Sequence, residues 1–377
     1  MTTLPSRSNI LNASVVTLAL DGLPHSLLLA TTADRRLNAL KVTDLTLRKS
    51  LSGLQDSPVL SMAVLKDQYL LSTSMSGQLL LSDLDGNIID QRRDHSKYVV
   101  KVIVHEMPET TLVATAGWDS KVVIYRQSSG QPRRLGEPFA TINLTTKPES
   151  MVFIQHPLTL EPLLIVSRTD SSFIYYYTTE AVPRLLGRQN LAPHSNAWVA
   201  FTPSTLALSP QDPSLLAVGT SSVPHMKLLI VRLLVPLFNQ TSDSQEPAPR
   251  IRTSLLDDSD ATETQASQAR AALAIAEKES AAIQIHCTTM APQTAYSTPA
   301  VAWRPDGSGV WSNGDDGAIR GVEVSSGKIA STLQGHEPGS KVRCLWAGLV
   351  DTGEGKEEWL ISGGFDQKLT VWRSAAS

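Results

Sequence analysis

Three residues near the carboxyl end of the chain carry the side chains of a nucleophilic catalytic triad. They are His336, Ser362 and Asp366, which in a hydrolase would act as base, nucleophile and orienting carboxylate. A catalytic serine must also face a cleft that holds hydrogen-bond donors for an oxyanion. Ser362 lies inside a strand-like run of apolar residues, so we expect its hydroxyl to point between strands. The sequence therefore predicts a structural role for these three residues.

Other motifs of catalysis and cofactor binding are absent from the sequence. It contains no Gly-x-Ser-x-Gly, no phosphate-binding Gly-Lys-Ser/Thr loop and no Gly-x-Gly-x-x-Gly after a strand. None of the 8 histidines lies three or four residues from another, and two cysteines, Cys287 and Cys344, cannot form a four-cysteine zinc site. We expect no enzyme activity, no cofactor and no bound metal.

The overall charge is close to balanced and excludes several classes of protein. The 377 residues include 33 Lys and Arg against 36 Asp and Glu, a net charge of −3, which argues against specific binding of nucleic acid. The longest apolar stretch, residues 215–238, is interrupted by prolines and charges and cannot span a membrane. The first ten residues have no apolar signal-peptide core. We expect an intracellular protein of the cytoplasm or nucleus.

The elements that must position the triad-like residues recur along the chain. The last unit has a Gly-His turn at 335–336, strands at 341–346 and 359–364, a tight turn at Asp366 and a third strand at 368–373. Sliding this unit along the sequence recovers seven copies. The tight-turn positions Asp34, Ser76, Asp119 and Asp170 are separated by 42, 43 and 51 residues. Such spacings are typical of four-stranded propeller blades of about 40–45 residues.

The last unit resembles a WD40 repeat, in which Trp372-Arg373 replaces the Trp-Asp pair that names the family. The resemblance implies an all-β fold, a seven-bladed WD40-type β-propeller with four antiparallel strands per blade. The expected blades are residues 12–52, 57–92, 97–144, 149–192, 203–288, 299–335 and 340–377. In this family an N-terminal strand completes the last blade, and residues 6–11 are expected to take that place.

The same resemblance implies hydrogen-bonded side-chain tetrads that tie the Gly-His turn to the central strands. One tetrad consists of His336, Ser362, Asp366 and Trp372. A substituted version in the third blade consists of His95, Thr115, Asp119 and Tyr125. An imidazole, a hydroxyl, a carboxylate and an indole N–H can donate and accept hydrogen bonds in series.

Blade five is interrupted by a long insertion, residues 237–280. This segment has eight acidic and four basic residues, a net charge of −4, and residues 239–280 lack aromatic side chains. It is too polar to fold independently, so we expect a surface loop that is partly helical and otherwise disordered. An Ala-rich stretch predicts a helix near 261–279. The helix either simply returns the chain to the outer strand, docks a partner, or lies on a membrane surface, the last disfavoured by its acidic, Trp-free face.

One face of the ring is the candidate surface for binding partners. In the WD40 family the residue before the tight-turn Asp points towards this face, and the residues at the start of the inner strands rim it. The candidate residues are Met75, Tyr98, Trp118, Asp315, Lys341 and Phe365. An exposed Trp and Phe would form one aromatic anchor patch, because aromatic residues dominate the energy of many interfaces. Ordinary packing of both rings over the blade tops is the alternative.

These observations predict a non-enzymatic scaffold or adaptor, a monomeric disc within a larger complex of proteins. A substrate receptor of a ubiquitin ligase is an alternative, although its usual Trp-Asp-x-Arg string is not present at Trp372-Arg373. A reader of histones or other peptides is another alternative. A phosphoinositide-binding propeller is disfavoured because Pro132-Arg-Arg-Leu-Gly136 does not match the Phe/Leu-Arg-Arg-Gly motif of that class.

Overall fold

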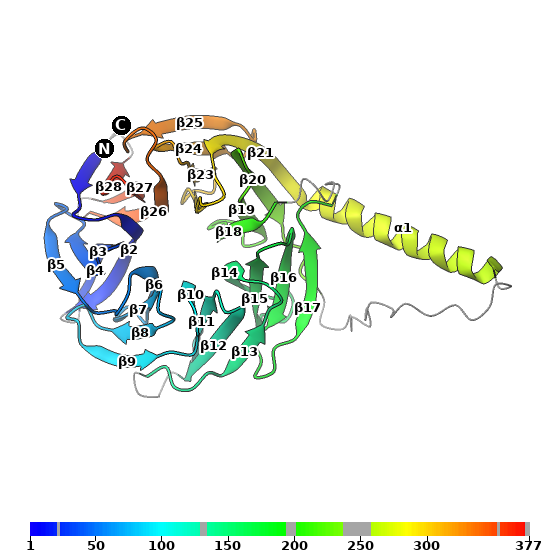
Figure 1. Ribbon diagram of the computed structural model, residues 1–377, viewed down its shortest axis with the longest axis horizontal. Helices are drawn as coiled ribbons and strands as arrows, with labels where there is room; N and C mark the ends of the chain where they lie inside the picture. Colours follow the sequence, from blue (N-terminus) through cyan, green and yellow to red (C-terminus); the bar gives the residue numbers. More distant parts are fainter. Residues whose placement is uncertain (21–22, 129–133, 194–200, 237–257, 353–354, 374–377) are drawn as a thin grey trace.

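Short runs of Val, Ile, Leu, Ser and Thr form the strands of this protein, and Gly, Asp and Ser form the turns between them, as β-propensity predicts. The computed structural model describes residues 1–377 except 21–22, 129–133, 194–200, 237–257, 353–354 and 374–377. The described residues form seven four-stranded antiparallel sheets, arranged as blades around a central opening (Figure 1). The prediction of a seven-bladed β-propeller is confirmed.

Each blade begins with an inner strand and continues outwards in sequence order. The first four blades consist of β2 Ile10–Leu20, β3 Leu23–Thr32, β4 Arg36–Lys41 and β5 Leu47–Ser52; β6 Val59–Leu65, β7 Tyr69–Ser74, β8 Leu79–Ser82 and β9 Ile88–Arg92; β10 Val99–Glu106, β11 Thr110–Gly117, β12 Lys121–Ser128 and β13 Ala140–Asn143; and β14 Pro148–Gln155, β15 Pro162–Arg168, β16 Phe173–Thr178 and β17 Leu185–Asn190. The remaining blades consist of β18 Pro203–Leu208, β19 Leu215–Thr220, β20 His225–Arg232 and β21 Ile283–Pro292; β22 Val301–Trp303, β23 Gly309–Asn313, β24 Ala318–Glu323 and β25 Ile329–Gln334; and β26 Val342–Asp351, β27 Lys356–Gly364, β28 Lys368–Arg373 and β1 Thr2–Pro5.

The N-terminus closes the ring, but with a different segment from the one expected. Strand β1 pairs antiparallel with β28, with Thr2 opposite Val371 and Pro5 opposite Lys368. The prediction that residues 6–11 form this strand is therefore wrong. The chain must cross from the rim of blade seven to the centre of blade one before β2 begins at Ile10, and residues 6–9 make that crossing.

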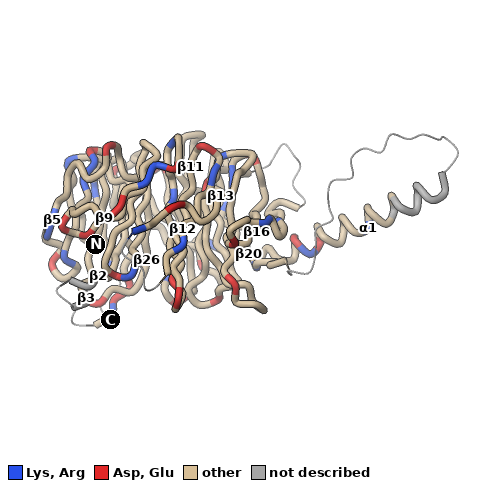
Figure 2. Tube along the Cα trace, turned by 90° about the horizontal axis from the view of Figure 1, so that it is seen from below, with Lys and Arg blue, Asp and Glu red and all other residues tan. Residues whose placement is uncertain are grey.

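The insertion in blade five lies between the third and outer strands, β20 and β21. Helix α1 Asp258–Ala282 is longer at both ends than the expected 261–279. It extends away from the disc, as the edge-on view in Figure 2 also shows. The carboxyl end of α1 is attached to blade four, where Oε1 of Glu279 accepts a hydrogen bond from the backbone N–H of Asn190 at 2.7 Å. Leu273 and Ile275 are exposed on the helix. The polar segment 237–257 that precedes α1 lies outside the described residues.

Apolar side chains between neighbouring blades form the core of the ring. At the seam between blades seven and one, Ile10 and Leu28 pack with Trp359, Ile361 and Val371, all five of them buried. Burial of large apolar side chains is the main stabilising contribution in such a seam. The two ends of the chain are therefore held together by strand pairing at the rim and by packing further in.

Candidate functional site

The triad-like residues of blade seven form a closed hydrogen-bond network. Nδ1 of His336 donates to the carboxylate of Asp366, 3.0 Å from either oxygen, and Nε2 accepts from Oγ of Ser362 at 2.8 Å. The indole N–H of Trp372 donates to the same Oγ at 3.1 Å. The side chains of His336 and Asp366 and the whole of Ser362 are 0% exposed. Because Ser362 is sealed from solvent, this arrangement can join the strands but cannot present a nucleophile to a substrate.

Blade three contains a related network with one difference. His95 is 2.9 Å from both Asp119 and Thr115, in the same arrangement as in blade seven. The hydroxyl of Tyr125, however, donates to Asp94 at 2.8 Å, since a phenol carries its donor farther from the backbone than an indole does. Burial and the Asp94 carboxylate both raise the pKa of Tyr125, which keeps the phenol protonated.

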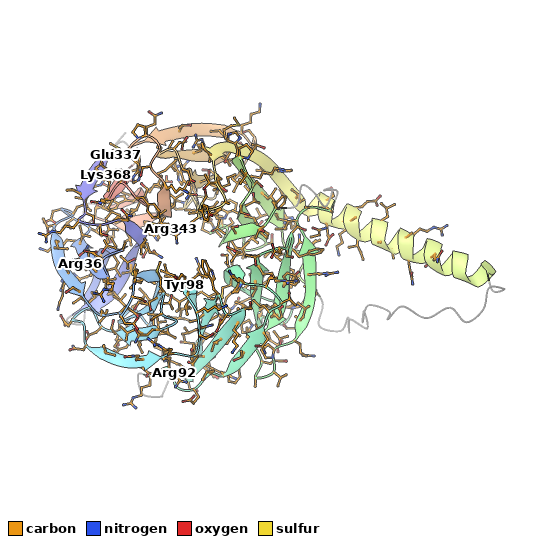
Figure 3. The ribbon with its side chains drawn as sticks, in the orientation of Figure 1. Arg36, Arg92, Tyr98, Glu337, Arg343 and Lys368 are labelled. Carbon is orange, nitrogen blue, oxygen red and sulfur yellow. The ribbon has the colours of Figure 1, made fainter. Side chains whose placement is uncertain are left out.

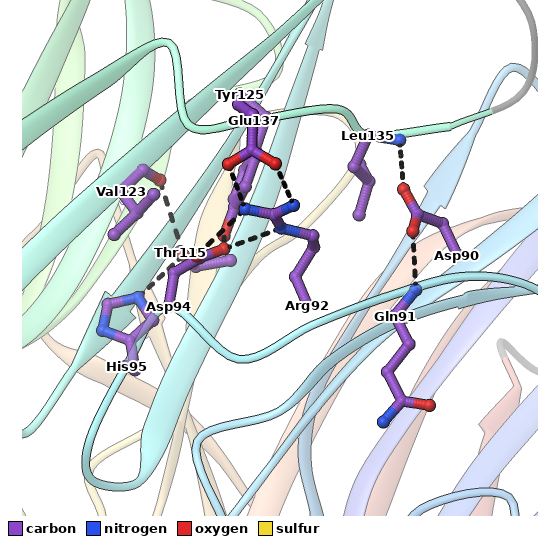
Figure 4. Close-up of polar contacts among 10 residues, drawn as sticks. All are labelled: Asp90, Gln91, Arg92, Asp94, His95, Thr115, Val123, Tyr125, Leu135 and Glu137. Carbon is purple, nitrogen blue, oxygen red and sulfur yellow. Dashed lines mark hydrogen bonds and ion pairs between the residues drawn. The ribbon is translucent and has the colours of Figure 1, made fainter.

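Asp94 links this network to the neighbouring blade. Figure 4 shows the guanidinium of Arg92, at the end of β9, between Asp94 and Glu137. Arg92 makes two hydrogen bonds of 2.8 Å to the Glu137 carboxylate, which comes just before β13. The outer strands of blades two and three are thus joined by a bidentate ion pair.

The turns between the second and third strands of the blades define one edge of the ring, here called the top edge. At this edge the residue before the tight turn donates its backbone N–H to the residue that precedes the inner strand. The donor and acceptor pairs are Ala33 and Asn9, Met75 and Pro58, Trp118 and Tyr98, Thr169 and Lys147, Ser221 and Thr202, and Phe365 and Lys341. In blade six, Asp315 donates to Pro292 instead. All six candidate partner-binding residues therefore lie along the top edge.

Two of the candidate residues form an exposed aromatic pair. The rings of Tyr98 and Trp118 stack with centroids 5.1 Å apart and an interplanar angle of 23°. Tyr98 is 40% exposed and Trp118 38% exposed. The ammonium of Lys147, from blade four, lies 4.9 Å from the centroid of Trp118 in a cation–π contact. These three residues are called the Trp118 cluster.

Three other candidates lie together on blades six and seven and are called the Phe365 cluster: Asp315, Lys341 and Phe365. Phe365 is 43% exposed. Nζ of Lys341 is 3.1 Å from the Asp315 carboxylate, whose side chain is only 11% exposed and also accepts a hydrogen bond from Ser297. Asp315 is thus engaged within the protein rather than free for a partner. Met75, on blade two, is partly buried.

The single aromatic patch expected from the sequence is in fact two clusters. Inner strands β26, β2, β6 and β10 are neighbours in that order, which places blades one and two between the Phe365 cluster and the Trp118 cluster. The sequence did not identify Lys147, although it occupies the same repeat position as Tyr98 and Lys341. The same repeat comparison that found those two residues would have found it. Tyr296, the most exposed aromatic residue described at 88%, was also missed.

The inner strands of all seven blades line a central channel with a volume of about 620 Å³. The charged residues among its described lining are Lys101, Glu149 and Arg343, each partly buried. Tyr98 and Arg343, labelled in Figure 3, lie at the inner ends of their blades around this opening. Burial raises the pKa of Glu149 to about 7, with Lys147 opposing and Asp170 adding to the shift. Burial lowers the pKa of Lys101 and of Arg343.

The described part of the chain includes the two cysteine thiols, Cys287 and Cys344, which bear on metal and thiol chemistry. It contains no group of three His, Cys, Asp or Glu side chains placed to hold a metal ion. Cys287 and Cys344 are both buried free thiols, and burial raises the pKa of Cys344 to about 12. That thiol stays protonated at neutral pH and is a poor nucleophile. None of the described helices combines the length and hydropathy that crossing a membrane requires.

The blade arrangement and its top edge define the class of protein as a seven-bladed β-propeller. A family model described as UCP007778, beta-propeller domain, matches residues 4–373, and the chain belongs to this family. No curated protein matches the sequence. The family match extends over nearly the whole ring, whereas the likeness to WD40 repeats remains an inference from the motifs of blade seven.

Proposed function

We propose that this propeller is a non-enzymatic scaffold, an intracellular subunit that binds other proteins through the top edge of the ring. The observation that carries the proposal is the Trp118 cluster. Its two stacked rings remain 38% and 40% exposed although they lie against the well-packed blade three. Exposed aromatic residues of this kind are typical anchors of protein interfaces, because they bury a large area at a small cost in conformational entropy.

The surroundings of the Trp118 cluster support this proposal. Stacking on Tyr98 and the cation–π contact with the Lys147 ammonium hold the indole in place before a partner arrives. A prearranged anchor loses less entropy on binding than a mobile one. The Phe365 cluster offers a second aromatic contact on the same edge, with Lys341 held by Asp315. A partner that spans the channel mouth would contact both clusters.

The test compares the wild-type protein with the Tyr98→Ala/Trp118→Ala double variant in affinity purification from cells, followed by quantitative mass spectrometry. We expect the double variant to lose at least one partner, with the affinity of that purified partner falling roughly a hundredfold, as removal of two interface anchors does. The matched control is Leu158→Ala, which removes a side chain that is 73% exposed in the turn between β14 and β15, at the opposite edge.

Thermal unfolding of each variant keeps the comparison interpretable. Both rings are partly exposed, so the double variant should fold with a melting temperature close to that of the wild type. If the folded double variant retrieves every partner in wild-type amounts, the Trp118 cluster is ordinary packing and the proposal is wrong. Loss of partners from Leu158→Ala instead would move the binding surface to the other edge.

A further inference from the structure

Two basic residues line the central channel, together with one acidic residue, Glu149. Lys101 comes from blade three and Arg343 from blade seven. Neither side chain makes an ion pair or a side-chain hydrogen bond with any residue that the structure describes. Both are partly buried, so each has lost part of its hydration without gaining a partner, which is unfavourable for a charged group. An anion bound in the channel would compensate for that loss.

β-Bulges recur on the inner strands that line the channel. Among the described inner strands, six have a register shift at the same repeat position, and the bulged residues are Leu11, Leu60, Val100, Glu149, Ser204 and Arg343. A bulge leaves one residue outside the regular strand pairing and redirects its side chain. Arg343 is itself the bulged residue of blade seven, and Lys101 follows the bulged Val100.

The remaining lining of the channel indicates the kind of anion. Apart from Lys101, Arg343 and Glu149, the described lining is uncharged and consists largely of Ser, Thr, Ala, Val and Leu. A densely charged polyanion such as a nucleic acid needs many more cations than two. A single extended peptide needs only a charge at intervals, small neutral side chains beside it and backbone partners. The lining of the channel supplies the charges and the small neutral side chains.

The cations also lie within reach of the aromatic residues on the top edge. Lys101 is three residues along β10 from Tyr98, which corresponds to about 10 Å of extended strand. Arg343 is two residues along β26 from Lys341, or about 7 Å. An extended peptide with an apolar residue on Trp118 would bring a side chain about three positions further on close to Lys101.

We propose that the channel receives an extended acidic peptide segment of a partner protein, which enters from the top edge and places carboxylates against Lys101 and Arg343. The inference rests on the proposed function, because the Trp118 cluster supplies the apolar anchor at the channel mouth. It adds the chemical class of the ligand: a segment rich in Asp or Glu next to an apolar residue. The carboxylates would form charge-assisted hydrogen bonds with the Lys101 ammonium and the Arg343 guanidinium.

The test is selection from a displayed library of randomised peptides of about eight residues, which span roughly 26 Å when extended. Peptides are selected on wild-type protein, sequenced, and their dissociation constants measured by fluorescence anisotropy. We expect enrichment of Asp and Glu and a roughly tenfold loss of affinity for each of Lys101→Gln and Arg343→Gln, because each removes one partner of a partly desolvated charge pair. The matched control is Lys121→Gln, an exposed lysine of the same blade outside the channel lining.

The outcomes separate this inference from the proposed function. One outcome is that the selected peptides depend on Trp118, show no acidic enrichment, and bind Lys101→Gln and Arg343→Gln as well as wild type. That outcome would overturn the acidic-peptide inference but would not contradict the proposed scaffold function. Peptides unaffected by Trp118→Ala would count against the proposed function. Equal losses from Lys121→Gln and Lys101→Gln would show a general charge effect and overturn the channel site.

The stability of a further variant gives an independent readout. Lys101→Met keeps most of the length of the side chain and removes its charge, so we expect a melting temperature equal to or above that of wild type together with loss of acidic selectivity. A clear fall in melting temperature would mean that Lys101 is held by the folded protein itself, and would overturn the premise of an uncompensated cation.

Discussion

Replacing Asp366 with alanine is expected to destabilise the propeller by about 3–5 kcal/mol. The carboxylate accepts hydrogen bonds from Nδ1 of His336 and from the backbone N–H of Glu337, both at 3.0 Å, and its side chain is 0% exposed. Alanine leaves these two donors without an acceptor, and each buried unsatisfied donor costs about 1–3 kcal/mol. A third, longer hydrogen bond from the backbone of Lys368, at 3.3 Å, adds little.

The assay is thermal unfolding followed by circular dichroism, supported by urea unfolding followed by tryptophan fluorescence. We expect the melting temperature of Asp366→Ala to fall by about 6–20 °C, since one kcal/mol corresponds to roughly 2–4 °C in a large domain. Asp119→Ala should give a similar fall, because Asp119 accepts from His95 at 2.9 Å and from the backbone of Ser96 at 3.0 Å.

The control for this prediction is Asp85→Ala. Asp85 pairs with Lys49 on the surface, and its side chain is 76% exposed. An exposed ion pair contributes little to stability, so the melting temperature should not change. If Asp366→Ala melts at the same temperature as Asp85→Ala, the buried network does not stabilise blade seven and the reasoning is refuted.

Two further predictions concern the closing strand and the channel wall. Deleting residues 2–5 removes the pairing of β1 with β28 and should lower the melting temperature substantially, whereas the substitution Ser8→Ala in the crossing segment should not; equal melting temperatures for the deletion and wild type would exclude this closure. The pKa of Glu149 is raised to about 7 in the folded protein, so its ionisation weakens the fold as pH rises from about 4.5 towards 7 and beyond. Glu149→Gln should match wild type in stability at about pH 4 and exceed it by about 1–2 kcal/mol at about pH 8, below the full linkage value because channel water still reaches the side chain. A difference that does not vary with pH would contradict the shifted pKa.

The sequence by itself determined the repeating architecture. Strand-forming runs and turn residues recur at spacings set by one blade, and each blade is a local unit of about 40–45 residues, so its pattern can be recognised without knowledge of the rest. The networks around His336 and His95 follow from the same repeat, because their members occupy corresponding positions of one blade. Only the last donor differed, since Tyr125 reaches Asp94.

Only the tertiary structure showed which strand closes the ring and which residues of different blades come together. Pairing of Thr2–Pro5 with β28 joins opposite ends of the chain, and no local pattern distinguishes these residues from the neighbouring segment 6–11. The same closure separates Trp118 from Phe365 and brings Lys147 of one blade over Trp118 of another. It also gathers Lys101, Glu149 and Arg343, from three different blades, around one channel. Contacts between blades depend on the order and curvature of the ring, and sequence periodicity carries information about single blades only.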